Sequence, residues 1–183
     1  MDEELNRIIR EARRGSKDAF AILVHRFKDH VYRYAYGMIG DRMEAEDIAQ
    51  EAFLKCFAAL PRLENEFSFV SWLNRIVSNL CADRLRKRSK ERLKAASVEA
   101  LDAIEISSAQ EQQRVRNLKM TIEEAMKQLS LDHRQIILLH DVQGFRYEEI
   151  ARMLEIPVGT VKSRLNSARL ALRLAMRRGE EEE

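Results

Sequence analysis

The sequence has few of the residues that build turns. Six Gly and two Pro occur among 183 residues, which leaves little turn chemistry for a protein made of β-strands. No apolar stretch approaches the roughly 20 residues that span a bilayer. The first residues, MDEELNRIIREARRG, are amphipathic and acidic at their start, unlike a signal peptide. We therefore expect a mostly helical protein that does not insert into a membrane.

Cysteine and histidine patterns that bind metals are also missing. Cys56 and Cys81 stand alone, and neither a CxxC pair nor an HExxH sequence occurs. Metal sites and disulfide frameworks need such spacings, and two isolated thiols are typical of a reducing compartment. We expect no metal, no cofactor and a cytoplasmic location.

The net charge of +2 hides three blocks of charge along the chain. Residues 41–66 hold seven acidic and three basic side chains, residues 84–94 hold seven basic and one acidic, and residues 146–178 hold eight basic and three acidic. Separate blocks of opposite sign predict surfaces with different partners.

Helical periodicity divides the chain into two parts. Apolar residues recur at helical spacing through the first ninety residues, interrupted near Gly15, Gly40 and Pro61. Residues 91–117 have no aromatic side chain and sparse apolar content, which is typical of a linker. The sequence predicts an all-α fold with a helical domain over residues 1–90, a flexible linker over 91–117, and a second helical domain over 118–183.

The second domain contains the pattern of a helix-turn-helix in YEEIARMLEIPVGTVKSRLNSARLAL. Glu155 and Ile156 would supply the turn, and Pro157 suits the first turn of the second helix because its missing N–H would be unpaired there. The inner faces of the two helices would be formed by small and aliphatic residues. These are Ile150, Ala151, Leu154, Val158, Val161, Leu165, Ala168 and Leu172.

The outer face of this second helix is polar and basic. Its residues, at the face or its edges, are Thr160, Lys162, Ser163, Arg164, Asn166, Ser167 and Arg169. Such side chains reach base edges and phosphates when a helix lies in the major groove. A helical hairpin with a solvated basic face is the alternative, and the complete turn spacing favours DNA binding.

A second candidate site lies in FSFVSWLNRIVSNLCADRLRKRSK. Phe67 and Phe69 lie in or beside a loop, and basic residues follow at the end of the helix that comes next. Aromatic side chains can hold unstacked bases while cations follow the phosphates. Trp72 is in register with Leu73 and Ile76, which favours a place in the core. For Phe67 and Phe69, the core and a base-binding role are both open.

An acidic helix is predicted in EAEDIAQEAFLKCF. Its buried stripe would hold Ala45, Ile48, Ala49, Ala52 and Phe53. A second stripe, away from the core, would hold Asp47, Gln50, Glu51 and Leu54. A solvated helix face would show the same pattern, so the pattern alone does not distinguish a docking surface from an ordinary exterior.

Three motifs together resemble a known family. AEDIAQEAF, then FVSWLNRIVSN with ADRLR, then YEEIARMLEIPVGTVKSRL occur in this order. They are similar to the motifs of bacterial RNA polymerase sigma factors of the extracytoplasmic-function (ECF) group. The resemblance implies two sigma domains and no enzymatic activity. It implies a protein that binds core RNA polymerase and promoter DNA, melts the minus-10 element, and answers to an anti-sigma factor in a stress or envelope response.

The resemblance also implies a role for each motif. The acidic helix is similar to the segment that docks on the clamp helices of the polymerase largest subunit, and the flap of the second-largest subunit is a further implied contact. The implied polymerase-binding residues are Asp47, Gln50, Glu51 and Leu54.

The other two motifs resemble promoter-reading elements. The second resembles the minus-10 reader, where a base is flipped into a pocket beside the loop. Its implied DNA contacts are Phe67, Phe69, Asn79, Asp83, Arg84, Arg86, Lys87 and Arg88. The helix from Pro157 resembles the minus-35 reader, with implied contacts Thr160, Lys162, Ser163, Arg164, Asn166 and Ser167.

Two other classes of protein compete with this interpretation. A helix-turn-helix regulator that binds operator DNA without polymerase accounts for the C-terminal motif and leaves the acidic helix unexplained. A nuclease would need clustered carboxylates for a metal. Asp47 and Glu51 share a helix face, but no second carboxylate pair or His accompanies them.

Overall fold

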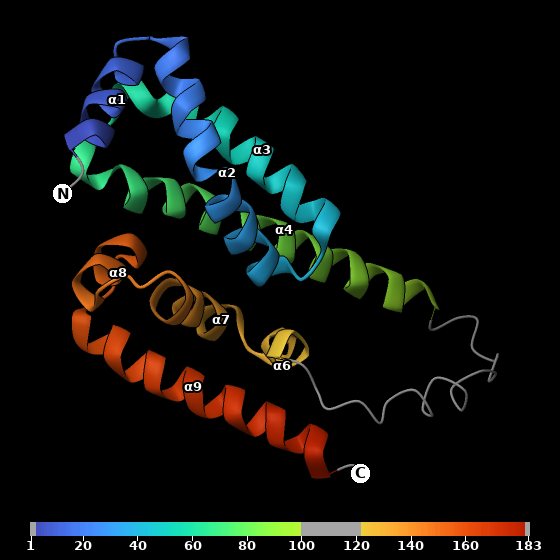
Figure 1. The fold of residues 1–183 in the computed structure, drawn as a ribbon. Helices are drawn as coiled ribbons and strands as arrows, with labels where there is room; N and C mark the ends of the chain where they lie inside the picture. Colours follow the sequence, from blue (N-terminus) through green and yellow to red (C-terminus); the bar gives the residue numbers. More distant parts are fainter. Residues whose placement is uncertain (1–2, 100–121, 182–183) are drawn as a thin grey trace.

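The computed structural model describes residues 3–99 and 122–181, with side chains for 3–91 and 122–177. Within those residues every regular element is helical, as predicted (Figure 1). An N-terminal domain and a C-terminal domain lie side by side, with α2 and α4 of the first facing α6, α7 and α8 of the second.

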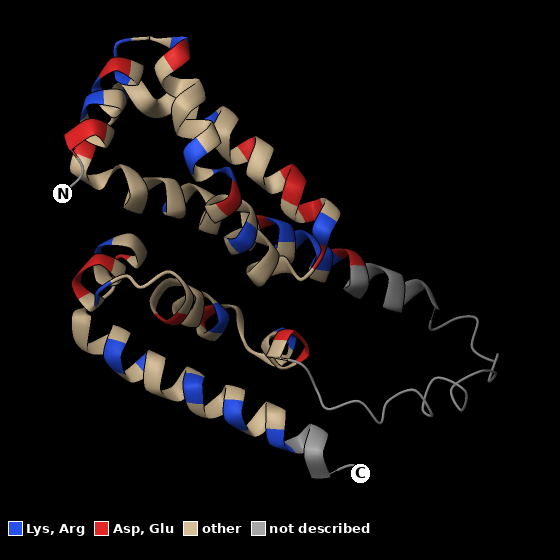
Figure 2. Ribbon diagram, in the orientation of Figure 1, with Lys and Arg blue, Asp and Glu red and all other residues tan. Residues whose placement is uncertain are grey.

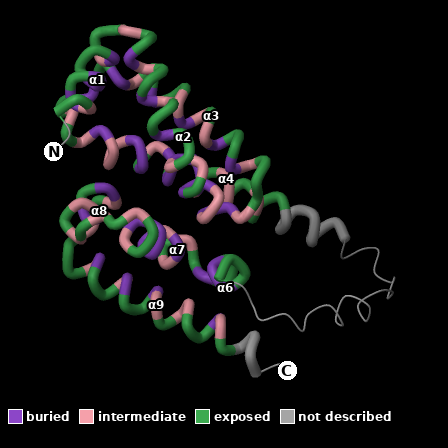
Figure 3. Tube along the Cα trace, in the orientation of Figure 1, coloured by how far each residue is buried: buried purple, intermediate pink, exposed green. Residues whose placement is uncertain are grey.

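The N-terminal domain is formed by four helices and two short turns. They are α1 (Glu3–Arg13), α2 (Lys17–Ile39), α3 (Arg42–Ala59), the 3₁₀ turns η1 (Leu60–Arg62) and η2 (Glu66–Ser68), and α4 (Phe69–Glu99). The helix α2 contacts the other three helices. Buried residues gather on the faces where the helices meet (Figure 3).

Local capping chemistry explains where these helices begin and end. The Ser16 hydroxyl accepts a hydrogen bond from the Ala19 N–H, which starts α2. Gly40 ends α2 with a φ of 72°, a conformation that glycine adopts without strain. The Asp41 carboxylate then accepts from the Glu44 N–H and starts α3.

The helix α4 is longer than the predicted one. It continues through Glu99, so residues 91–99 of the expected linker are helical. The remainder of that linker and residues 118–121, the expected start of the second domain, lie outside the described residues. The domain boundaries drawn from the sequence therefore stay predictions.

The C-terminal domain consists of short helices packed on one long helix. They are α6 (Ile122–Gln128), α7 (Leu131–Ile137), the π-helical turn η3 (Leu138–Val142), α8 (Tyr147–Leu154) and α9 (Val158–Glu181). The turn between α8 and α9 passes through Glu155, whose φ is 55°. The two helices and this turn are the predicted helix-turn-helix.

Most of the predicted inner face of α9 is correct. Val161, Leu165 and Ala168 are wholly buried. The prediction was wrong for Val158, which is 41% exposed, because it stands at the first position of α9. The sequence also missed Met153 of α8, which is buried.

The domain interface contains a close helix contact at Gly37 and the buried cation of Arg134. A Cβ atom at Gly37 of α2 would lie 2.7 Å from the Leu138 side chain of η3, so the missing side chain allows the close approach. The buried Arg134 guanidinium donates to the carbonyls of Met126, Lys127 and Leu129 in its own domain and to that of Met38 in the other. The domains are therefore joined by packing and hydrogen bonds.

Candidate nucleic-acid and partner interfaces

The acidic stripe of α3 faces away from the core. Asp47 and Gln50 are exposed, and Leu54 is 71% exposed although it is apolar. Glu51 is half-buried and forms a surface ion pair of 3.1 Å with Lys55. On the opposite side Ala45, Ile48 and Ala52 are wholly buried. We call Asp47, Gln50, Glu51 and Leu54 the docking stripe; acidic residues recur along this helix in Figure 2.

Two exposed apolar residues extend the docking stripe beyond the prediction. Met43 is 79% exposed and Phe57 is 46% exposed. With Asp47, Gln50 and Leu54 they recur at alternating intervals of four and three residues, which places them along one side of the helix. That spacing was readable in the sequence. A helix face with apolar ends and a polar centre is suited to a protein partner.

The loop between α3 and α4 has buried ends and an exposed tip. Leu63 is buried, and the Asn65 carboxamide accepts a hydrogen bond of 2.9 Å from the Phe67 N–H. The Phe67 ring is 58% exposed. Phe67 therefore lies outside the core, and its role as a base contact stays a prediction.

Phe69, by contrast, was wrongly placed among the DNA contacts. It is wholly buried and packs against Phe27 and Trp72, with ring centroids 5.5 and 6.1 Å apart. The cause is that α4 starts at Phe69 itself, so its side chain belongs to the helix face that closes the core. Trp72 lies at the edge of that core and is half-buried.

An ion-pair cluster that the sequence did not reveal ties the loop to α1. The Glu66 carboxylate lies 2.9 Å from the Arg10 guanidinium and 3.6 Å from that of Arg13. The pKa of Glu66 lies below its usual range because its own backbone N–H, and then Arg10, hydrogen-bond the carboxylate. The partners are more than fifty residues apart, so no local pattern announces the cluster.

The predicted minus-10 residues of α4 lie in two different environments. Asn79, Asp83, Arg86 and Lys87 are exposed, and Arg84 is half-buried. Arg86 pairs with Asp83 at 3.1 Å and Lys87 approaches Glu91 at 4.0 Å, both on the surface.

Arg88 is engaged within the protein instead. Its guanidinium lies 2.6 Å from Glu44 and 3.9 Å from Asp41, at the N-terminus of α3. The basic cluster therefore offers Arg86 and Lys87, and in part Arg84, to solvent and uses Arg88 to join two helices.

A hollow of about 300 Å³ lies between the loop, α4 and α8. The residues that line it come from both domains: Asn65, Phe67, Ser68, Ser71, Trp72, Arg75, Glu149, Arg152 and Met153. We call it the α4 hollow. Beside it the Arg75 guanidinium of α4 lies 2.7 Å from the Glu155 carboxylate of the helix-turn-helix. The first helix of the C-terminal motif therefore forms one wall of a space beside the exposed Phe67.

The outer face of α9 is open. Lys162, Ser163, Asn166 and Ser167 are exposed, and Thr160 is partly so. Lys and Arg recur along this helix, which lies on the side of the C-terminal domain away from the N-terminal domain (Figure 2).

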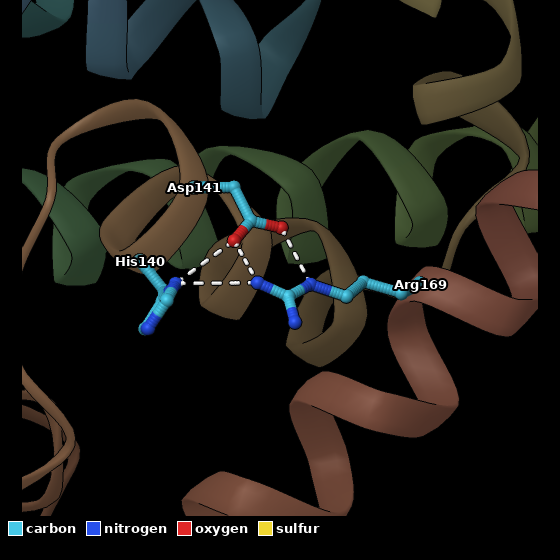
Figure 4. A network of polar contacts seen from close by, with 3 residues as sticks. All are labelled: His140, Asp141 and Arg169. Carbon is cyan, nitrogen blue, oxygen red and sulfur yellow. Dashed lines mark hydrogen bonds and ion pairs between the residues drawn. The ribbon is translucent and has the colours of Figure 1, made fainter.

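Two arginines of α9 are held by carboxylates of their own domain. Arg164 lies 3.2 Å from Asp132 at the start of α7. Arg169 donates from two nitrogens to the two oxygens of Asp141, with an Nε–Oδ2 distance of 3.0 Å, and His140 lies 2.8 Å from the same carboxylate (Figure 4). Hydrogen bonds from Arg169, and then from His140, hold the pKa of Asp141 below its usual range. Arg169 therefore fixes α9 on η3.

Reactive and metal-binding chemistry is sparse in the described residues. No cluster of three or more His, Cys, Asp or Glu side chains there is arranged to hold a metal ion. Burial raises the pKa of the Cys56 and Cys81 thiols to about 12, so both are protonated at neutral pH. No helix in the described part of the chain is long and apolar enough to cross a membrane.

Comparison with protein families matches most of the chain in two blocks. Residues 23–91 match Sigma-70 region 2, and residues 119–172 match Sigma-70 region 4. The first block ends before the region outside the described residues, and the second contains the helix-turn-helix.

Individual relatives match over nearly the full length. The sequence is 34% identical to the ECF RNA polymerase sigma factor SigW of Bacillus subtilis (strain 168), over 97% of this chain and 99% of that protein. It is 31% identical to the ECF RNA polymerase sigma-E factor of Escherichia coli (strain K12), with 90% of each covered. The solved sigma factor RpoE of Bartonella quintana, in complex with the anti-sigma factor NepR, is 27% identical with a TM-score of 0.69 over 88% of this chain and 98% of that one.

Proposed function

The chain belongs to the extracytoplasmic-function group of RNA polymerase sigma factors, and from that premise we propose how its surfaces divide the work of transcription initiation. As a sigma factor it binds core RNA polymerase and directs promoter recognition, minus-10 melting and initiation. The proposal assigns these steps to three separate surfaces: the docking stripe, the loop with α4, and the outer face of α9.

The docking stripe is the observation that carries this division. Leu54 is a large apolar side chain 71% exposed on a helix whose other side is wholly buried. Leu54 is not part of the hydrophobic core among the described residues, and the neighbouring carboxylates complement a basic partner. We assign the stripe to the clamp helices of the polymerase largest subunit, and a further polymerase contact to the flap of the second-largest subunit. An operator-binding regulator would have no use for such a surface.

The loop and α4 are assigned to the melted minus-10 element. Phe67 offers an exposed aromatic face for stacking on an unpaired base. The exposed Asn79 and Asp83 lie on the same helix, where they can contact the single strand, and the solvent-facing cations beyond them follow its phosphates. These cations are Arg84, Arg86 and Lys87.

The outer face of α9 is assigned to the minus-35 duplex. Its exposed or partly exposed residues near the helix start present hydroxyl, amide and ammonium groups of the kind that read base edges and phosphates. They are Thr160, Lys162, Ser163, Asn166 and Ser167. Arg164 joins them when its guanidinium leaves Asp132 for a guanine edge, because the Asp132 side chain is 59% exposed and an ion pair with a partner in solvent is weak.

An anti-sigma factor is the remaining partner in the proposal. The Bartonella quintana sigma factor of similar fold was solved with the anti-sigma factor NepR. We assign to this chain the same type of control, with release in a stress or envelope response.

The test is a footprint of the full chain on duplex promoters selected from a random library, with and without core polymerase. With core polymerase we expect protection of two separated elements and a run-off transcript. Without it we expect no specific protection, because base pairing hides the minus-10 bases. Tight protection of one palindromic site by the chain alone would identify an operator-binding regulator. Metal-dependent cleavage of the DNA would identify a nuclease.

A further inference from the structure

Phe67 separates two hollows. One is the α4 hollow, where Phe67 forms part of the lining. The other is an open cleft of about 730 Å³ between α1 and the loop, and Phe67 is part of its lining too. We call the second the α1 cleft, and its lining residues are Glu3, Glu4, Asn6, Arg7, Arg10 and Phe67. An exposed aromatic ring shared by two adjacent hollows can contact a different base on each side.

We propose that the α1 cleft is a second nucleobase site for single-stranded promoter DNA, and that it takes a base carrying an exocyclic amino group. The inference rests on the proposed sigma-factor function, and it adds α1 to the surface that reads the melted strand. The helix α1 ends at Arg13, before the block that matches Sigma-70 region 2 begins at residue 23.

The size and walls of the cleft suit a base. Its volume falls within the roughly 300–1,000 Å³ of small-molecule sites. Phe67 supplies an aromatic face, and the guanidinium groups of Arg7 and Arg10 can stack on a base in the same way. Asn6 adds an amide that can donate and accept hydrogen bonds.

The charges in the cleft favour a base over a phosphate. Glu3 and Glu4 bring two carboxylates, which repel a phosphate and accept hydrogen bonds from an amino group. Adenine, cytosine and guanine carry such a group and thymine does not. Arg7 and Arg10 are also partly neutralised, since Arg7 approaches Glu11 at 3.8 Å and Arg10 pairs with Glu66.

The ion-pair cluster at Glu66 orders the backbone of the loop that carries Phe67. Phe67 follows Glu66, which two arginines of α1 hold, and its own N–H is bound to Asn65. Ordering the loop in advance removes part of the entropy cost of binding. Glu66 is therefore a positioning residue for both hollows.

The experiment measures binding of a labelled single-stranded minus-10 oligonucleotide to the full chain assembled with core polymerase. Each nucleotide is replaced in turn by an abasic one. We expect two sensitive positions, each losing about 5- to 150-fold in affinity, which is the range for one stacked base. With Phe67→Leu, abasic replacement at either position should no longer change the affinity.

A second variant separates the two positions. Glu3→Ala with Glu4→Ala should abolish the discrimination against thymine at one sensitive position and leave the other unchanged. Asp18→Ala is the matched control, because Asp18 is an acidic residue in the first turn of α2 that does not line the cleft. Thermal melting of each variant checks that the fold is intact.

The outcomes keep the two proposals apart. A single abasic-sensitive position, or unchanged discrimination against thymine in the Glu3 and Glu4 variant, would overturn the second base site and leave the sigma-factor function standing. Failure of the unaltered chain to bind core polymerase, or of the assembled holoenzyme to bind the oligonucleotide, would overturn the proposed function first.

Discussion

The two DNA-facing regions of the molecule differ in how accessible they are. The outer face of α9 is open, with Lys162 and Asn166 exposed on the side away from the N-terminal domain. The α4 hollow beside Phe67 has the C-terminal domain as one wall, and Arg75 is paired with Glu155 at its edge. The C-terminal domain therefore leaves the face assigned to duplex DNA open, while its α8 helix lines the hollow beside Phe67, which is assigned to the melted strand. We therefore expect the contact between the domains to limit access to the surface assigned to the single strand.

The largest effect on stability is expected at Arg134, because its guanidinium bonds to carbonyls within the C-terminal domain and to one in the N-terminal domain. Arg134→Met removes the guanidinium that donates hydrogen bonds to four backbone carbonyls, those of Met126, Lys127, Leu129 and Met38. Hydrogen bonds to a charged group contribute about 1.5–3 kcal/mol each, so we expect unfolding to become easier by at least about 3 kcal/mol. Chemical denaturation measures the change. Arg173→Met, at an exposed position of α9, is the control, and an equal loss there would contradict the assignment.

A charge reversal in the docking stripe tests whether a third surface, separate from the two assigned to DNA, binds polymerase. Asp47 is exposed, so Asp47→Lys should change the free energy of unfolding by no more than about 0.5 kcal/mol. Loss of an interfacial charge contact should weaken polymerase binding by roughly 2–5 kcal/mol. Polymerase affinity and thermal melting are measured on one sample. An unchanged affinity for polymerase would show that the docking stripe is an ordinary solvated helix face.

Substitutions of Arg164 and Lys87 should distinguish sequence-specific contacts to the duplex from phosphate contacts to the single strand. Arg164→Ala should lose roughly 1–3 kcal/mol of recognition at one minus-35 position. Lys87→Ala should weaken all promoters alike and lower the salt dependence by about one counterion. Transcription from permuted minus-35 elements at several salt concentrations separates the two. The same sequence-independent loss in both variants would remove Arg164 from base readout.

A side chain at Gly37 should separate the domains without damaging either. Gly37→Gln places atoms where Leu138 now lies, while glutamine favours the helix by up to about 1 kcal/mol relative to glycine. If the closed arrangement limits access, the chain without polymerase should bind a single-stranded minus-10 oligonucleotide about tenfold more tightly, because a larger fraction is competent. Scattering should show a larger radius of gyration. Gly159→Gln, with open space around it, is the control and should change neither.

The smallest effect is expected at the carboxylate that positions α9. The pKa of Asp141 is held below its ordinary value of 3.8, chiefly by Arg169. Its contribution to stability is therefore present above that pH and is lost as the pH falls through the folded-state pKa. Asp141→Asn should lower stability at pH 7 by less than about 1 kcal/mol, since the pair is partly exposed. At pH values below the lowered folded-state pKa the variant and the parent should converge, and a difference that stays constant with pH would assign the effect to packing.

The sequence alone was sufficient for features that depend on local periodicity and capping. Gly15, Ser16 and Gly40 mark helix ends because φ preferences and caps act within a few residues. The buried faces of α3 and α9 follow from the 3.6-residue repeat, and so does the exposure of Asp47 and Lys162. The order of the three motifs was enough to indicate the family.

Only the tertiary structure decided which of two similar residues is available. Phe67 and Phe69 are both aromatic and two residues apart, yet one is exposed and the other completes the core. Arg88 lies in the same basic run as Arg86 and is paired with α3. Three further features join residues far apart in the chain. They are the ion-pair cluster at Glu66, the Arg134 contacts and the wall that α8 forms beside the α4 hollow. The periodicity of apolar residues indicates which face of a helix is buried and which is exposed. It does not indicate which other helix covers the buried face, because that depends on how residues far apart in the chain pack together.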